Sequence, residues 1–210
     1  MQDAVGHGDS DVGPGFQSWQ QSADDASTIL KNKHPDKTDL IGMGHSFGGI
    51  LTLQMAAKNQ GMFKKVILLD PILMPQQLLD MQLDMKTPNP MSAKALSRRN
   101  SWQNRQEAKE YFLSKSIYKT WTAESIECFL DYALEVLEDG TLTLKCPPSI
   151  EASIFGSGPQ GIWSLIEEVE DDIHIIYGSD SYPFIEMSCQ QAGSSIRESL
   201  MKNFQEAIVL

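Results

Sequence analysis

Residues 44–48, GHSFG, follow the pattern G-x-S-x-G, and their surroundings narrow the fold of this chain more than any other stretch. A short apolar run that begins at Asp39 precedes the pattern and predicts a buried parallel strand. The residues that follow are apolar on nearly every face, which predicts a buried helix that stops near Gly61. The sequence therefore predicts a serine on a tight turn between a strand and a helix.

A turn of this kind projects the hydroxyl of Ser46 beyond the edge of the sheet, where it can act as a nucleophile. Glycines at both flanking positions, Gly44 and Gly48, are expected to relieve the crowding that the turn imposes. The following helix points its first N–H groups at the substrate, so the backbone N–H of Phe47 is expected to stabilise an oxyanion. Chance glycine–serine turns share the pattern, but the strand before and the helix after favour the nucleophile.

Further apolar runs alternate with helical patterns along the chain. "KKVILLDP" predicts a second buried strand that ends at Asp70, "DDIHIIYGSDS" predicts a third, and "EAIVL" begins a fourth. Helical patterns occupy residues 17–33 and 187–204. Strands that alternate with helices indicate an α/β fold with a parallel sheet flanked by helices.

The interval from Met74 to about Gly161 interrupts this alternation and is too long for a simple crossover. It reads as mostly helical, and residues 124–140 carry apolar side chains at helical spacing with Gly140 closing the pattern. We interpret it as a helical lid inserted between the second and third strands. The predicted organisation is a first core part at 1–73, a lid at 74–161 and a second core part at 162–210.

Composition excludes several classes of partner. A formal net charge of -11 argues against nucleic acid and anionic membrane surfaces. Three widely spaced cysteines predict neither a disulfide framework nor a metal site, and they fit a reducing compartment such as the cytoplasm. No apolar run reaches the roughly 18 residues of a membrane span. The predicted partner is a small-molecule substrate, and no metal or organic cofactor is implied.

The chain resembles the α/β-hydrolase superfamily over essentially its whole length. "DAVGHGDS" at the start is similar to the D-x-R-G-H-G-x-S loop of many members, with Val5 in place of the arginine. The G-x-S-x-G turn follows about thirty residues later, at the distance usual in the family. Residues 98–112 and "LTLKCPP" resemble a subset that includes peroxisomal lipases and fungal toxin-biosynthesis hydrolases, which allows a peroxisomal location for a longer protein. The resemblance implies a partial α/β-hydrolase fold with a cap.

The family orders its catalytic residues as serine, acid and histidine, and two aspartates are candidates for the acid. Asp180 follows the third predicted strand, one residue earlier than the family's usual acid, and Ser181 occupies the usual place. Asp70 follows the second strand, where some members carry the acid, although an Asp-Pro pair is also an ordinary strand stop. The sequence favours Asp180 and leaves Asp70 open, because it does not reveal turn geometry.

The catalytic histidine, which acts as the base in this family, is harder to assign to a residue. The family's histidine follows its last strand, and this chain ends at Leu210 within that predicted strand. The family's first four strands and its second oxyanion donor also precede the matched region. Without the neighbours that the family supplies, strand 39–45 is expected to show an open edge and an exposed apolar face. We expect a fragment of a longer hydrolase, with a structural role for each histidine present: His7, His34, His45 and His174.

The expected function is hydrolysis of an ester-type small molecule by Ser46. Aromatic and methionine side chains of the lid favour an apolar acyl group, although such side chains also pack lid helices together. Serine at the turn is inconsistent with the aspartate-dependent dehalogenases and epoxide hydrolases of the same superfamily. The alternative function is a non-catalytic binding protein that has kept the pocket and lost the triad.

Overall fold

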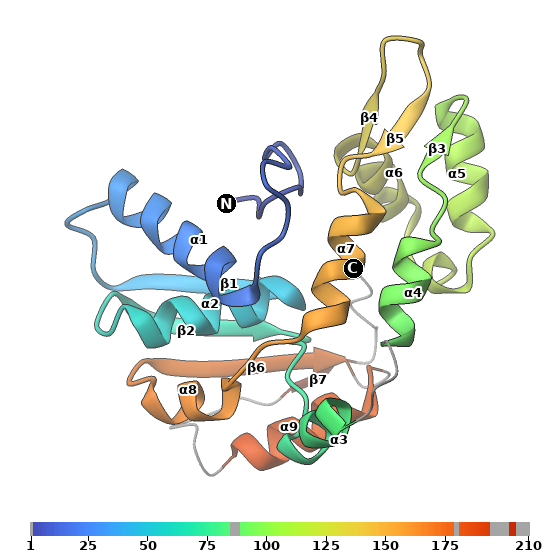
Figure 1. The fold of residues 1–210 in the computed structure, drawn as a ribbon. Coiled ribbons are helices and arrows are strands. Elements are labelled where there is room, and N and C mark those ends of the chain that lie inside the picture. Colours follow the sequence, from blue (N-terminus) through green and yellow to red (C-terminus); the bar gives the residue numbers. More distant parts are fainter. Residues whose placement is uncertain (1, 85–88, 179–180, 194–201, 205–210) are drawn as a thin grey trace. The chain divides into compact units, whose positions relative to one another are not determined.

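The structure, a computed structural model, describes residues 2–84, 89–178, 181–193 and 202–204 (Figure 1). These residues group into two compact units. The sheet unit contains the described residues of 19–84 and those from 159 onward. The insert unit contains residues 2–18 and 89–158. The lid boundaries at 74 and 161 remain a prediction.

A parallel sheet organises the sheet unit. Its described strands lie in the order β1-β2-β6-β7, and every neighbouring pair is parallel. In the register of the sheet, Met43 of β1 pairs with Ile67 of β2, and Ile67 pairs with His174 of β6. The predicted α/β class is confirmed. The strands are β1 Leu40–His45, β2 Phe63–Leu69, β6 Asp172–Gly178 and β7 Lys202–Phe204.

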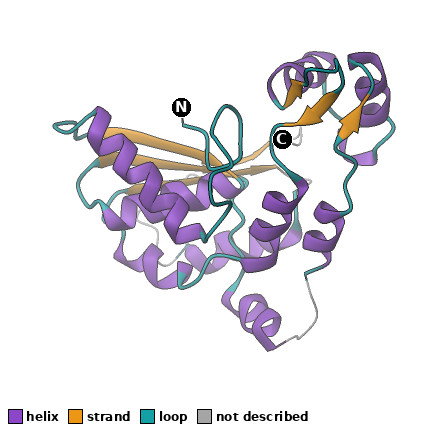
Figure 2. Cartoon of the chain, turned by 45° about the horizontal axis from the view of Figure 1, so that its top comes forward, coloured by secondary structure: helices purple, strands orange, loops and turns teal. Residues whose placement is uncertain are grey.

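The helix after β1 packs against the sheet. Its side chains Ile50, Leu53 and Ala56 are fully buried, as the apolar sequence predicts. Gly42 of β1 faces this helix so closely that a Cβ at that position would lie 2.7 Å from the methyl group of Thr52. The helices of the unit are α1 Trp19–Lys33, α2 Phe47–Lys58, α3 Gln76–Asp84, α8 Ile162–Glu168 and α9 Pro183–Ala192 (Figure 2).

Strand β1 forms an edge of the described sheet, with β2 as its neighbour there. Since Gly42 faces α2, the alternate residues Ile41 and Met43 point to the opposite face, where they are 63% and 61% exposed. The expectation of an open edge with exposed apolar side chains is confirmed among the described residues. The expectation that β1 is a buried strand is therefore wrong for one of its faces.

The insert unit combines helices with a small antiparallel sheet of order β3-β5-β4. Asn104 accepts a hydrogen bond from the N–H of Glu107 and Thr122 accepts one from that of Ser125, so two of its helices begin at side-chain caps. The elements are α4 Pro90–Leu96, β3 Ser101–Trp102, α5 Arg105–Leu113, a 3-10 turn at Ser116–Tyr118, α6 Ala123–Tyr132, β4 Leu134–Val136, β5 Leu142–Leu144 and α7 Pro148–Ser157.

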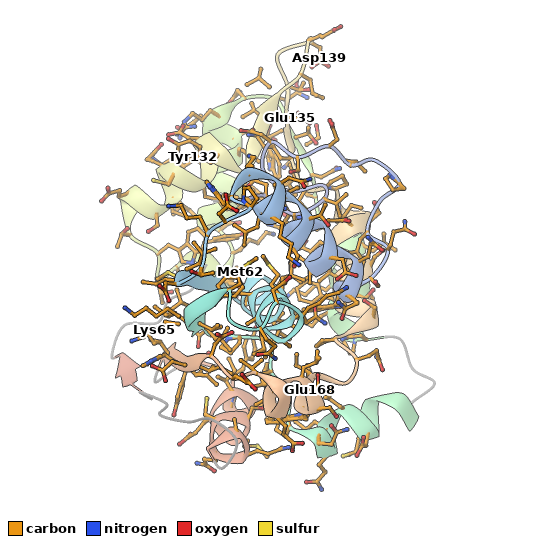
Figure 3. All side chains as sticks on the ribbon, turned by 90° about the vertical axis from the view of Figure 1, so that its left-hand side faces the viewer. Met62, Lys65, Tyr132, Glu135, Asp139 and Glu168 are labelled. Carbon is orange, nitrogen blue, oxygen red and sulfur yellow. The ribbon has the colours of Figure 1, made fainter. Side chains whose placement is uncertain are left out.

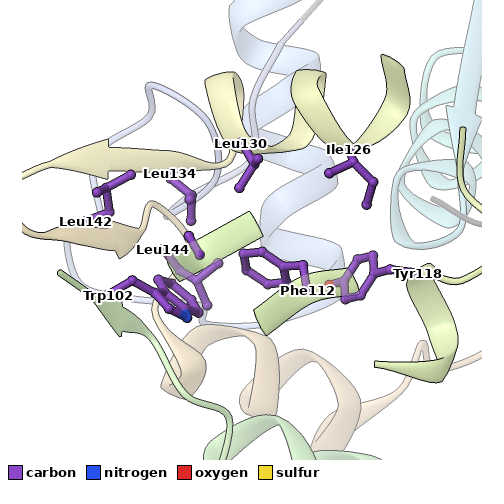
Figure 4. Close-up of a cluster of buried hydrophobic side chains, with 9 residues drawn as sticks. Trp102, Phe112, Tyr118, Ile126, Leu130, Leu134, Leu142 and Leu144 are labelled. Atoms are coloured by element: carbon purple, nitrogen blue, oxygen red, sulfur yellow. The ribbon is translucent and has the colours of Figure 1, made fainter. Parts of the chain in front are cut away.

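Aromatic and aliphatic side chains together form the core of the insert unit (Figure 4). The ring of Phe112 lies 5.0 Å from Trp102, 5.3 Å from Tyr118 and 4.9 Å from Phe129, measured between centroids. Trp102 and Phe112 are almost completely buried. These rings pack on one another, which is the structural alternative weighed against a pocket lining. Edge-to-face pairs of this kind add to the stabilisation that burial provides.

Phe112→Ala is expected to lower the free energy of unfolding by about 3–5 kcal/mol, because it empties the centre of this core. Leu113→Ala is the matched control, since Leu113 is adjacent in α5 but 45% exposed. Urea unfolding monitored by tryptophan fluorescence measures both changes. Equal losses in the two variants would contradict the assigned core.

The predicted helix over residues 124–140 is wrong beyond Tyr132. The chain turns into a hairpin, in which buried Leu134 pairs with buried Leu144. Asp139 at its tip accepts hydrogen bonds from the backbone N–H and hydroxyl of Thr141, and Gly140 has a positive φ of 83° (Figure 3). The Asp-Gly pair is thus a hairpin turn, and Leu134 before it lies in a strand.

The predicted helix over residues 187–204 is also displaced. Helix α9 begins at Pro183, whose fixed φ suits a first helical position, and ends at Ala192. Residues Lys202–Phe204 form strand β7 instead of helix, since their backbone pairs in parallel with β6. The strand predicted within residues 206–210 lies outside the described residues.

Candidate active site

Ser46 occupies the turn between β1 and α2 in a strained backbone conformation. Its φ is 51° and its ψ is -115°, a region that residues with a side chain rarely adopt. Strand and helix approach closely there, and a Cβ on Gly44 would lie 2.1 Å from the carbonyl oxygen of Gly48. Only glycine fits at position 44 without movement of the backbone.

Gly48 does not relieve crowding at the turn, contrary to the expectation from the sequence. A Cβ added to Gly48 meets no atom within 4 Å, so its own side is open and crowding does not require glycine there. Its carbonyl oxygen is the group that Gly44 must clear, and it also accepts a hydrogen bond of 2.8 Å from the hydroxyl of Thr52. The crowding that the sequence assigned to both flanking glycines therefore acts at Gly44.

Hydrogen bonds fix the backbone of Ser46, whereas its hydroxyl makes none among the described residues. The Ser46 N–H donates to the carbonyl of Leu69 at 2.9 Å, and its carbonyl accepts from the N–H groups of Ile50 and Ile72, each at 3.4 Å. A serine before a helix commonly caps it with its side chain, but Ser46 makes no such bond. No hydrogen bond of its Oγ is found among the described residues. The hydroxyl is therefore available for chemistry.

Phe47 is the first residue of α2, a helix of 12 residues. Its ring packs edge-on against Trp19 of α1, with centroids 4.8 Å apart. This contact fixes the first turn of the helix beside Ser46. The positive end of the helix dipole lies at the same place, which suits an N–H group that stabilises negative charge.

Asp70 lies directly after β2 and also has a positive φ, 39°. Its N–H donates to the carbonyl of Ile176 at 2.8 Å, and its Oδ1 accepts a hydrogen bond of 3.2 Å from the N–H of Gly178. The carboxylate is therefore placed at the carboxyl edge of the sheet, one strand away from Ser46. Asp180 lies outside the described residues.

The four histidines are all described, and the three in the sheet unit, His34, His45 and His174, make no hydrogen bond to Ser46 among the described residues. Burial lowers the pKa of His45, and the nearby charge of Asp70 partly offsets this effect. His174 contacts Asp172 at 3.2 Å within β6, and His34 lies exposed after α1. In the insert unit, His7 contacts the carbonyl of Val5 at 3.0 Å through Nδ1.

Two of the three cysteines are weak nucleophiles. Burial raises the pKa of Cys146 to about 11 and that of Cys189 to about 12, so both remain neutral thiols near pH 7. Cys128 is exposed, and all three are free. Within the described ranges, no three potential ligand side chains gather closely enough to hold a metal ion. None of the described helices has the length and apolar character needed to cross a membrane.

The sequence missed the backbone links that hold this site together. Leu69 and Ile72 flank Asp70 and bond to both sides of the Ser46 peptide. Backbone groups carry no residue-specific signal, and only the Leu-Asp-Pro stop after the second strand pointed to a turn there.

Comparison with known proteins places the chain in a family. Residues 1–127 match the family described as Hydrolase_4, serine aminopeptidase, S33. An abhydrolase domain-containing protein of Alternaria alternata is 26% identical over 111 residues, which cover 50% of this chain and 39% of that protein. The chain thus spans about two fifths of the length of the curated relatives that it matches.

Solved structures agree on the fold. A peroxisomal alpha-beta-hydrolase of Saccharomyces cerevisiae superposes with a TM-score of 0.76 at 17% identity, covering 96% of this chain and 58% of that one. An esterase of Mycobacterium tuberculosis gives 0.73 at 16% identity, covering 96% and 67%. With the family match over more than half of its residues, the chain belongs to the Hydrolase_4 family of the α/β-hydrolase superfamily.

Proposed function

We propose that this chain carries the nucleophile of a serine hydrolase that acts on an ester-type small molecule. The observation that supports it best is Ser46 itself: a strained turn residue with a fixed backbone and an uncommitted hydroxyl. Strain at a residue that makes no structural use of its side chain is typical of functional sites.

The proposed chemistry uses side chains and backbone alone. A histidine accepts the Oγ proton as Ser46 attacks the acyl carbon, and the N–H of Phe47 stabilises the oxyanion that forms. The same histidine then passes the proton to the departing alcohol, and water hydrolyses the acyl-enzyme. Asp180 or Asp70 orients the imidazole. None of His34, His45 and His174 is hydrogen-bonded to Ser46 in the described part of the sheet unit, so the proposal assigns the base to none of them.

The proposed substrate carries an apolar acyl group. Solved relatives named as an esterase and as a thioesterase domain support acyl transfer as the reaction class. Exposed methionines occur in both units, Met81 at 55% and Met91 at 40%, and such side chains adapt to apolar ligands. The aromatic rings of the insert give less support than the sequence implied, since they pack on one another.

The second candidate function is a binding protein that does not catalyse. The observation that favours it is that no described histidine of the sheet unit is hydrogen-bonded to Ser46. In this case the turn and the fold would remain while the hydroxyl stays unreactive.

A fluorophosphonate probe separates the two functions in the natural gene product that contains residues 1–210. The catalytic proposal predicts covalent labelling at Ser46, located by peptide mass spectrometry, and complete loss of labelling in Ser46→Ala. Ser153→Ala is the control, because Ser153 is an exposed residue of α7. A folded wild-type protein that shows no labelling would favour the binding function.

A further inference from the structure

The side chains of Cys146 and His7 are in contact within the insert unit. The Cys146 Sγ lies 3.5 Å from the His7 Nε2, which is a hydrogen-bond distance for sulfur. The ring is oriented from its other side, because the His7 Nδ1 lies 3.0 Å from the carbonyl oxygen of Val5. A carbonyl only accepts, so Nδ1 carries the proton of the neutral ring and Nε2 is left as an acceptor. The thiol of Cys146 therefore donates to His7.

Neighbouring contacts hold the two segments that carry this pair together. Lys145, next to Cys146 in the chain, forms an ion pair of 2.6 Å with Asp9. Gly6 packs against α7, since a Cβ at its position would lie 3.3 Å from a side-chain carbon of Ile150. The position of the pair therefore does not depend on the S–H···N hydrogen bond alone.

The surroundings of the sulfur keep it protonated at rest, but they also contain groups that favour a thiolate. Burial raises the pKa of Cys146 to about 11, and the carboxylate of Glu151 adds to this effect. The guanidinium of Arg98 and the backbone N–H of Glu151, in the first turn of α7, oppose it. Arg98 and Glu151 also form an ion pair of 2.9 Å, so their opposite charges partly cancel. Near pH 7 a base is needed to remove the thiol proton, and His7 is placed to accept it.

We propose that Cys146 and His7 form a second nucleophilic site, in which His7 accepts the thiol proton as Cys146 adds to a small uncharged alkene conjugated to a carbonyl group. A cysteine that contacts a base, with the base oriented by a third group, is the general arrangement of an activated nucleophile. An uncharged reagent is favoured, because the site is half-buried and lies beside a carboxylate. The site uses neither Ser46 nor any other residue of the sheet unit.

The proposed step is an addition without a leaving group. The Sγ forms a bond to the β-carbon of the alkene, and the π electron pair moves to the α-carbon and its carbonyl as an enolate. The thiol proton passes to the His7 Nε2, which gives an imidazolium. Transfer of that proton to the α-carbon then restores the neutral ring and leaves Cys146 as a thioether.

N-ethylmaleimide, an uncharged alkene of this kind, tests the site in the natural gene product containing residues 1–210. Peptide mass spectrometry measures the labelling rate of each cysteine separately. His7→Gln is expected to lower the Cys146 rate at neutral pH by about 100-fold, the lower end of what a positioned base contributes. His34→Gln, in an exposed loop after α1, is the matched control for loss of one imidazole and is expected to leave the Cys146 rate unchanged.

The pH dependence of the wild-type rates provides a readout that a purely structural role of His7 would not produce. The Cys146 rate is expected to level off in the range in which imidazoles generally become neutral, between about pH 5 and 8, since the step needs a neutral ring. The rate at exposed Cys128 is expected to keep rising above that range, because an unassisted thiol reacts as its thiolate.

Three results would overturn the proposal. These are a folded wild-type protein that is not labelled at Cys146, equal Cys146 rates in the wild type and in His7→Gln, and a Cys146 rate that rises with pH in parallel with that of Cys128. Thermal unfolding shows whether His7→Gln folds like the wild type. If it does not, the wild-type pH profile decides the matter without the variant.

Discussion

Gly44→Ala is expected to destabilise the chain by about 3 kcal/mol or more, because the added methyl group overpacks a site bounded by backbone. Its Cβ would lie 2.1 Å from the Gly48 carbonyl oxygen and 2.6 Å from the Gly49 nitrogen. Neither atom belongs to a flexible side chain, so β1 and the start of α2 must move apart. The hydrogen bonds that hold the Ser46 peptide would be lost with that movement.

Gly48→Ala is the matched control, two residues on the other side of Ser46. Its Cβ meets no atom within 4 Å, and alanine is the better helix former at this position in α2. Its free energy of unfolding is expected to equal that of the wild type or to exceed it by up to about 1 kcal/mol. Denaturant unfolding of both variants measures the difference. Equal destabilisation by the two substitutions would mean that β1 and α2 do not approach as closely as described.

The contrast between these glycines shows what the sequence can and cannot reveal. The pattern G-x-S-x-G predicts the strand, the turn and the helix, because apolar runs and glycines are local signals. It does not reveal that position 44 must lack a side chain, or that the carbonyl oxygen of Gly48 is the atom a side chain there would meet. That distinction depends on the angle at which β1 enters α2, and this angle comes from packing of the whole unit.

The errors in secondary structure have a similar origin. Leu134 and Leu137 continue the helical spacing of α6, but Leu134 pairs across a hairpin with Leu144. Gly140 suits a helix stop and a hairpin turn equally well, and the strand after it is only three residues long. Short antiparallel strands carry too few residues for their alternation to compete with a helical pattern.

The backbone geometry at Asp70 also required coordinates. An Asp-Pro pair after a strand is compatible with an ordinary strand end. The sequence shows neither the positive φ of Asp70 nor its hydrogen bond from the N–H of Gly178. Ser46 and Asp70 are separated by a helix and a strand, both have a positive φ, and the Ser46 N–H donates to the residue before Asp70. Contacts of this kind arise from sheet register, which a single sequence does not specify.

Residues 1–210 purified alone are expected to show no hydrolysis of a p-nitrophenyl ester that depends on Ser46. The reason is the placement of the histidines in the sheet unit. His174 pairs with Asp172 along its own strand, and His34 lies in an exposed loop after α1. His45 neighbours Ser46 in sequence, but no hydrogen bond joins the two side chains among the described residues.

The expected loss is large, because a serine hydroxyl is a poor nucleophile without a base. In subtilisin, a different hydrolase, removal of the base alone costs about a million-fold in turnover. Background hydrolysis by the chain and by its Ser46→Ala variant should therefore be indistinguishable. Stopped assays on both proteins at matched concentration measure the difference, with unfolding curves confirming that both are folded.

Strong hydrolysis that disappears in Ser46→Ala would contradict this expectation and identify a base within the chain. Single alanine substitutions at the four histidines would then locate it. His45 would be the first to examine, because its lowered pKa keeps the imidazole neutral and able to accept a proton near pH 7. Its proximity to the Asp70 charge would favour the imidazolium that forms.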